Sequence, residues 1–227
     1  MNKLLRLGIT VDGIIRDKIY QFDSMYRKKY IRNEGLVKMN EYFEYVDEED
    51  NEDEDTRIEN LIKDKIHLPV STTDLTNHYD FKNETEFLYF QNVEYVLQIF
   101  GVSPSYPKAM DTSNRIQFIG EEEKKYSTTL LCEGTDQVIT STYHFMTKNA
   151  CRIKNISFTK IDESLWNHFD ILITDQPSIL DNKPSNKLSI KINHLYNKES
   201  PADLELESLK DFSSAVFLEK IKTIFFN

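Results

Sequence analysis

Residues 4–17 read LLRLGITVDGIIRD, and this stretch decides the fold of the 227-residue chain. It begins with an apolar run of the length expected for a buried strand. The run ends in a small acidic loop, Thr10–Gly13, after which apolar residues recur at helical spacing. In an α/β fold, ligands bind at the carboxyl ends of the strands. The stretch therefore predicts a strand, a loop with a candidate site, and a helix.

The predicted helix is carried by apolar and aromatic residues between Ile14 and Tyr30. Asp12 and Gly13 stand where a helix cap and a tight turn are expected, and Asp17 falls in the first turn. The start of a helix binds anions well, because its N–H groups are unpaired and its dipole favours negative charge. An ordinary strand, loop and helix with a capping aspartate explains the same residues, and the spacing alone favours it.

Composition predicts a folded domain with an acidic surface. The length fits one large domain or a core with an inserted subdomain, and 39% hydrophobic with 12% aromatic residues suffices for a core. A net charge of −10 argues against sequence-specific nucleic-acid binding, because phosphate contacts need clustered Lys and Arg. The two cysteines, Cys132 and Cys151, form no Cys-x-x-Cys pair, which argues against a structural zinc site.

Targeting signals are not evident in the sequence. We find neither the pattern of a signal peptide nor an apolar run approaching the length of a membrane span. We therefore expect synthesis in the cytoplasm and no membrane partner.

The region from residue 31 to residue 125 differs in character and is predicted to be an α-rich, cap-like insertion. It contains an acidic run, residues 47–55, which is typical of a solvated loop. A calcium loop of the EF-hand type is excluded, because that pattern requires a central glycine that the run lacks. Helices are predicted over 57–66 and 84–100, the second ending at Gly101, and His78 is interpreted as structural.

The second half alternates between strand and helix patterns. This alternation predicts βαβ units and a parallel sheet. Strands are expected at 126–132, 152–159, 169–174 and 188–192, and helices at 138–148, 162–168 and 212–226.

Two segments resemble motifs of the haloacid dehalogenase-like (HAD-like) phosphohydrolases. The first motif of that family is an apolar strand that ends in Asp-x-Asp-Gly, and here Asp12 and Gly13 match its second half. The fourth motif is an apolar strand that presents an aspartate for Mg²⁺, and Asp175 in the segment 170–177 matches it. The resemblance implies a HAD-like, Rossmannoid α/β fold with a parallel sheet flanked by helices. Its core would comprise residues 1–30 and 126–227, with 31–125 as the cap-like insertion.

Other positions depart from the family pattern. The nucleophilic first aspartate is replaced by Thr10, and the partner acid often found after the fourth-motif aspartate is Gln176. The second motif, a strand that ends in Ser or Thr, would fall at the end of the strand 126–132, which runs into Cys132, with Thr135 close by. Candidates for the third-motif lysine are Lys154, Lys160 and Lys183.

The replacement at position 10 removes the central chemistry that the resemblance implies. In this family the first aspartate attacks phosphorus and also helps to bind Mg²⁺. A threonine without an adjacent base is a poor nucleophile and a weak metal ligand. We therefore expect no catalytic residue and no cofactor, and a relic phosphate or metal site made of Thr10, Asp12, Gly13 and Asp175. The alternatives are a Mg²⁺-dependent phosphohydrolase acting on a small phosphomonoester or nucleotide, with Asp12 as its acid or base, and a pseudoenzyme that binds a phosphorylated ligand.

The sequence style also resembles that of proteins from crAss-like tailed bacteriophages. Lys, Asn, Ile, Tyr and acidic residues are abundant and glycines are few. This resemblance implies a non-catalytic structural protein of the virion. Such a protein would form an oligomeric ring of the viral tail barrel with itself and other ring proteins, after assembly in the host cytoplasm.

Overall fold

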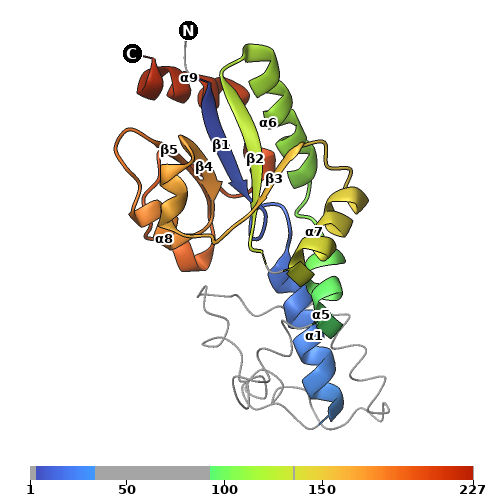
Figure 1. Cartoon of the computed structure of the whole chain (residues 1–227). Helices are drawn as coiled ribbons and strands as arrows, with labels where there is room; N and C mark the ends of the chain where they lie inside the picture. Colours follow the sequence, from blue (N-terminus) through green and yellow to red (C-terminus); the bar gives the residue numbers. More distant parts are fainter. Residues whose placement is uncertain (1–3, 34–92, 135, 227) are drawn as a thin grey trace.

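A computed structural model describes residues 4–33, 93–134 and 136–226. Its centre is a six-stranded sheet in the order β3-β2-β1-β4-β5-β6, in which every neighbouring pair is parallel (Figure 1). The predicted α/β class and parallel sheet are confirmed. The strands are β1 (Leu5–Thr10), β2 (Tyr126–Cys132), β3 (Asn155–Phe158), β4 (Ile171–Thr174), β5 (Leu188–Ile192) and β6 (Leu204–Leu206).

Strand β1 lies in the middle because its sequence suits burial on both faces. Leu7 and Ile9 are fully buried on one face. On the other face Gly8 has no room for a side chain, since a Cβ there would lie 2.6 Å from a methyl group of Leu131. Parallel strands covered on both sides have such continuous apolar sequences. The quoted stretch therefore fixes the strand around which the sheet is built.

Helices cover the two faces of the sheet and complete a three-layer fold. Helices α6 (Ala109–Glu123), α7 (Asp136–Lys148) and α9 (Ser214–Phe225) contribute to the larger core on one face. On the other face, the 3₁₀-helix η3 (Glu163–Asn167) and α8 (Pro177–Asp181) pack over Leu131 and Leu172. Two further 3₁₀-helices, η4 (Leu195–Asn197) and η5 (Leu209–Asp211), lie in connections near β6. None of the helices described is long and apolar enough to cross a membrane.

A helical stalk extends from the carboxyl edge of the sheet (Figure 1). It consists of α1 (Lys18–Asn33), the short helix α5 (Val93–Val96) and the π-helix η2 (Leu97–Gly101). Helix α6, which falls inside the predicted insertion 31–125, packs instead against β2 in the main core. Among the described residues, those that stand apart from the sheet are therefore the residues of α1, α5 and η2.

The helix after β1 starts later than the sequence predicts. It was expected from Ile14, but α1 begins at Lys18, and the backbone N–H of Tyr20 donates to Asp17 at 2.9 Å. Asp17 therefore caps the helix, and the predicted capping role of Asp12 is wrong. The physical reason is that the N–H groups of Ile15 and Arg16 both donate to the carbonyl of Val11, which closes a separate turn and leaves Asp12 six residues before the first residue of α1.

Several other predictions fall outside the described residues. These are the acidic run 47–55, the helix 57–66, His78 and the first part of the helix 84–100. The last part of that helix is present as α5 and η2.

Candidate functional site

A pocket of about 160 Å³ lies at the carboxyl edge of the sheet, where the strand order reverses. From β1 the chain adds β2 and β3 on one side, and β4, β5 and β6 on the other. In open α/β sheets, ligands bind at this kind of switch point. The structure thus brings together all four residues predicted to form the relic site. The pocket is lined by Thr10, Val11, Asp12, Gly13, Lys18, Ile19, Leu131, Glu133, Ile161, Asp175, Gln176 and Tyr196.

Thr10 ends β1 and is held by the neighbouring strand β4. Its side-chain oxygen lies 3.4 Å from the carbonyl oxygen of Ile173 and 3.3 Å from the hydroxyl of Thr174. The residue is only 2% exposed. Neither neighbouring oxygen is a base that would deprotonate the hydroxyl at neutral pH. Thr10 is therefore a buried strand residue whose hydroxyl forms its hydrogen bonds with the neighbouring strand.

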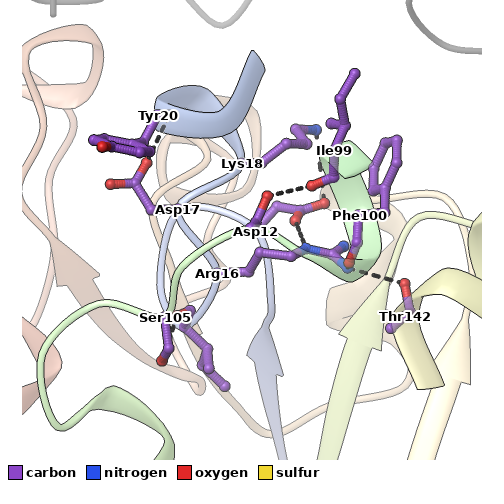
Figure 2. A network of polar contacts seen from close by, with 11 residues as sticks. Asp12, Arg16, Asp17, Lys18, Tyr20, Ile99, Phe100, Ser105 and Thr142 are labelled. Carbon is purple, nitrogen blue, oxygen red and sulfur yellow. Dashed lines mark hydrogen bonds and ion pairs between the residues drawn. The ribbon is translucent and has the colours of Figure 1, made fainter. Parts of the chain in front are cut away.

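Asp12 is paired with two cations from its own loop and helix (Figure 2). One carboxylate oxygen lies 2.5 Å from Nε of Arg16, and the other lies 3.6 Å from Nζ of Lys18. Burial alone would raise the pKa of Asp12, but the two positive charges outweigh it and hold the pKa below its ordinary value. Asp12 therefore stays ionised and is a poor proton donor.

Arg16 is fully buried and extends the Asp12 ion pair into the core. Its Nη1 donates to the carbonyl of Phe100 at 2.6 Å and to the hydroxyl of Thr142 at 3.0 Å (Figure 2). The guanidinium also lies over the rings of Phe100 and Phe145, at 5.1 and 5.3 Å from their centroids. A buried guanidinium needs a carboxylate partner, because an uncompensated buried charge is costly. Asp12 supplies that partner and is thereby committed to a structural role.

The two chain segments that lead into and out of the stalk are also paired. The N–H of Asp17 donates to the carbonyl of Pro104, and the N–H of Tyr106 donates to the carbonyl of Ile15, each at 2.9 Å. Arg16 lies between these hydrogen bonds, and its backbone forms an isolated antiparallel β-bridge with that of Ser105. The ion pair of Asp12 therefore stands at the junction between stalk and sheet.

Asp175 follows β4 and faces a different environment. It is 1% exposed; one carboxylate oxygen accepts from the Tyr196 hydroxyl, and the other accepts from the side-chain amide of Gln176 at 3.0 Å. Burial raises the pKa of Asp175 above its ordinary value, while the Tyr196 hydrogen bond and nearby His194 oppose that rise only in part. Asp175 is thus a buried carboxyl that is held by neutral donors.

Gly13 is required between the two aspartates. Its φ is +80°, and a Cβ at this position would lie 1.9 Å from an oxygen of Asp175. Its carbonyl lies 2.9 Å from Nε2 of His194. Only glycine allows both the backbone conformation and the close approach of Asp175.

The structure places none of the three candidate lysines in the pocket. Lys154 and Lys160 are exposed and pair with Glu121 and Asp162, and Lys183 pairs with Asp203. Lys18 lines the pocket instead. Thr135, the nearby second-motif candidate, lies outside the described residues.

The donors at this edge do not suit Mg²⁺. The ion needs oxygen ligands in near-octahedral geometry and is usually bound through one or two carboxylates. Thr10 is neutral, both Asp12 oxygens face cations, and both Asp175 oxygens accept hydrogen bonds. Within residues 4–33, 93–134 and 136–226, no group of three or more His, Cys, Asp or Glu residues is placed to hold a metal. The side chains at this edge therefore do not fit a bound Mg²⁺ ion.

Comparison with known proteins identifies the fold. No family model matches the chain, and no curated protein matches it by sequence. Its structure is similar to a phosphonoacetaldehyde hydrolase-like protein from Oleispira antarctica, with 7% identity, a TM-score of 0.54, and coverage of 100% of this chain and 98% of that one. The fold is HAD-like. A HAD family hydrolase from Deinococcus radiodurans, solved with phosphate and sodium, has 11% identity, a TM-score of 0.53, and coverage of 96% and 97%.

A third similar structure is β-phosphoglucomutase from Clostridium difficile, with 15% identity, a TM-score of 0.51, and coverage of 97% of this chain and 98% of that chain. At these identities the similarity establishes the HAD-like fold and leaves the activity open. The fold predicted from the first and fourth motifs is therefore confirmed. The virion, tail and ring predictions receive no support from the similar structures.

Three residues at the site were missed by the sequence analysis. Arg16 stands four residues after Asp12, a spacing that often joins opposite charges, and this signal was available. Lys18 falls inside the predicted helix, and its position there does not distinguish it from other lysines. Tyr196 comes from the connection between β5 and β6, outside every motif, and nothing local in the sequence indicates its contact with Asp175.

Proposed function

We propose that this HAD-like protein binds a small phosphorylated ligand and leaves its phosphoryl group in place. The observation that carries the proposal is the state of the three key side chains. Thr10 is neutral, Asp12 is paired with Arg16, and Asp175 accepts hydrogen bonds from Tyr196 and Gln176. The groups that would attack, transfer a proton or bind a metal in an active phosphohydrolase are thus absent or engaged.

The loss of phosphoryl transfer follows from the position of Thr10. A hydroxyl nucleophile needs an adjacent general base. The nearest groups to the Thr10 hydroxyl are a backbone carbonyl and the hydroxyl of Thr174. Asp12, the other candidate for acid or base, has a lowered pKa and its oxygens face Arg16 and Lys18. Within the described part of the chain, no side chain that contacts Thr10 therefore prepares the attack.

Ligand binding is supported by the charge and size of the pocket. Lys18 lines the pocket with its side chain 21% exposed, and Gln176 and Tyr196 add further polar groups. Arg16 and Lys18 both pair with the single carboxylate of Asp12, so the three side chains together carry a net positive charge that favours an anion beside Lys18. The exposed Glu133 stands at the pocket as well, where solvent screens its charge. A volume of about 160 Å³ is below the range of drug-sized sites, which begins at about 300 Å³. The ligand is therefore small.

Titration of the full chain with inorganic phosphate, followed by calorimetry, tests ligand binding. We expect saturable binding that Lys18→Gln weakens by about tenfold, the effect of losing one charge-assisted hydrogen bond. Lys160→Gln is the matched control, because Lys160 is 83% exposed and lies outside the pocket. Equal affinities in the wild type and Lys18→Gln, or no binding by the wild type, would contradict the proposal.

Incubation with p-nitrophenyl phosphate and Mg²⁺ tests the loss of transfer. We expect the release of nitrophenol to equal that of a sample without protein. Turnover that both Asp12→Asn and Asp175→Asn abolish would replace this proposal with the alternative of an active Mg²⁺-dependent phosphohydrolase.

The hypothesis of a phage tail-barrel ring stays a separate prediction. It rests on composition, and its partners would be further copies of this chain and other ring proteins. Mass measurement under native conditions tests it. A protein that remains monomeric, alone and with the products of neighbouring genes, would count against the ring.

A further inference from the structure

The connection between β5 and β6 carries Tyr196 into the pocket. The residue belongs to the 3₁₀-helix η4, and its hydroxyl donates to Oδ2 of Asp175. This contact joins residues that lie 21 positions apart in the chain. Tyr196 therefore reaches the candidate site from a segment that carries neither of the two resembled motifs.

Neighbouring groups hold Tyr196 in place. Its ring stacks on His194, with centroids 5.1 Å apart and planes 9° apart. The side-chain amide of Asn197 donates to the backbone carbonyls of Asp175 at 2.7 Å and Ile192 at 2.8 Å. His194 also contacts the carbonyl of Gly13. The tyrosine hydroxyl is thus positioned by contacts on both sides of its own residue.

The Asp175 carboxylate has little open surface left. Tyr196 occupies Oδ2, Gln176 occupies Oδ1, and the backbone of Gly13 packs so closely that a Cβ there would lie 1.9 Å from Oδ2. A divalent cation bound to this carboxylate would have to make direct contact at about 2.0–2.1 Å. It would therefore have to compete with the tyrosine hydroxyl and the Gln176 amide for the lone pairs of the two carboxylate oxygens.

We propose that Tyr196 takes the place of a divalent cation at Asp175 and thereby keeps Mg²⁺ out of this site. The hydroxyl gives the buried carboxylate a neutral donor where a metal would give it positive charge. The site is consequently stable without a metal, and the replacement at Thr10 is only one of two changes that weaken metal binding. Restoring an aspartate at position 10 alone will therefore restore Mg²⁺ binding only in part.

The inference concerns the cation and is independent of whether the pocket binds a phosphorylated ligand. Its test compares the wild type, Thr10→Asp, Tyr196→Phe and the Thr10→Asp/Tyr196→Phe double variant, each as the full chain, in calorimetric titrations with Mg²⁺ alone. We expect no saturable binding to the wild type. The double variant is expected to bind Mg²⁺ about tenfold or more tightly than Thr10→Asp, because the ion no longer competes with a hydrogen bond to the carboxylate.

Two controls tie the effect to this contact. Asp175→Asn in the double variant is expected to abolish binding. Tyr143→Phe removes the hydroxyl of a tyrosine that is 49% exposed on α7. Added to Thr10→Asp, it is expected to leave the Mg²⁺ affinity unchanged. Equal Mg²⁺ affinities of Thr10→Asp and the double variant would overturn the proposal, as would wild-type binding that Asp175→Asn removes.

Because Thr10 is buried, an aspartate at that position can prevent folding. The proposal is then tested on Tyr196→Phe and the wild type alone, with bound Mn²⁺ measured by electron paramagnetic resonance. We expect Tyr196→Phe to bind Mn²⁺ about tenfold more tightly than the wild type, because the competing hydrogen bond to Asp175 is removed. Equal binding by the two proteins would overturn the proposal.

Discussion

The two aspartates of the pocket are held in opposite ways. Asp12, after β1, faces the charges of Arg16 and Lys18, and its pKa is lowered. Asp175, after β4, faces the neutral donors Tyr196 and Gln176, and burial raises its pKa. The chain has kept both carboxyl groups while giving each an internal partner.

The difference shows why two retained motif residues need not mean retained chemistry. An ion pair with a buried arginine makes Asp12 part of the framework, since its loss would leave a buried charge unpaired. Removal of the Asp175 charge leaves no buried cation unpaired, because the hydrogen-bond donors to its carboxyl group are neutral and burial disfavours its charge. The same residue type at one edge of the sheet is thus structurally required in one loop and replaceable in the other.

Removal of the Asp12 charge is expected to have the largest effect on stability. Asp12→Asn leaves the fully buried Arg16 guanidinium without its carboxylate, and we expect a loss of about 3 kcal/mol in the free energy of unfolding. Urea unfolding measures it. Glu121→Gln is the control, because Glu121 and Lys154 form an exposed ion pair whose loss costs about 0.5 kcal/mol. Equal losses in the two variants would contradict a structural role for Asp12.

The contact between the two loops is tested at Gly13. Gly13→Ala is expected to cost about 2 kcal/mol, because the residue has a φ of +80° and its Cβ would collide with Asp175. In an Asp175→Ala background the collision is removed, and the expected cost falls to about 1 kcal/mol from the backbone alone. A double-mutant cycle by urea unfolding measures this coupling. Additive losses of unfolding free energy would show that Gly13 and Asp175 are not coupled through close packing.

Asp175→Asn is expected to have the smallest effect, with a change in unfolding free energy within about 1 kcal/mol at neutral pH. The sign depends on pH. A carboxyl whose folded pKa is raised contributes stability below its unfolded pKa of about 3.9, and the contribution is lost as the pH rises through the folded value. Relative to the wild type, Asp175→Asn therefore gains stability as the pH rises.

Asp12 is expected to show the opposite dependence. Its lowered pKa contributes stability above about pH 3.9, and this contribution is lost as the pH falls through the folded value. The deficit of Asp12→Asn relative to the wild type should therefore shrink in acid. Unfolding curves between about pH 3 and about pH 7 compare the two variants, and parallel profiles would contradict the contrast drawn here.

Much of the fold follows from local patterns. The apolar runs that became β1, β4 and β5 are continuous enough to predict buried parallel strands, and the resemblance of the segment 170–177 to the fourth HAD-like motif singled out Asp175. The edge strand β6 was missed because three half-buried or exposed residues carry no clear pattern. The late start of α1 was missed because Arg16 is fixed by Phe100 and Thr142, which lie 84 and 126 residues away along the chain. Tyr196 was missed for the same reason: its contact with Asp175 exists only in the folded chain.

A carbon-13 NMR titration of the Asp12 and Asp175 carboxyl groups tests the account most directly. It reads the protonation of each group separately in the folded wild-type protein. We expect Asp12 to titrate below about 3.9 and Asp175 above it. An Asp175 carboxyl that titrates below about 3.9, as one stabilised by a cation would, contradicts the claim that the two aspartates have opposite internal partners.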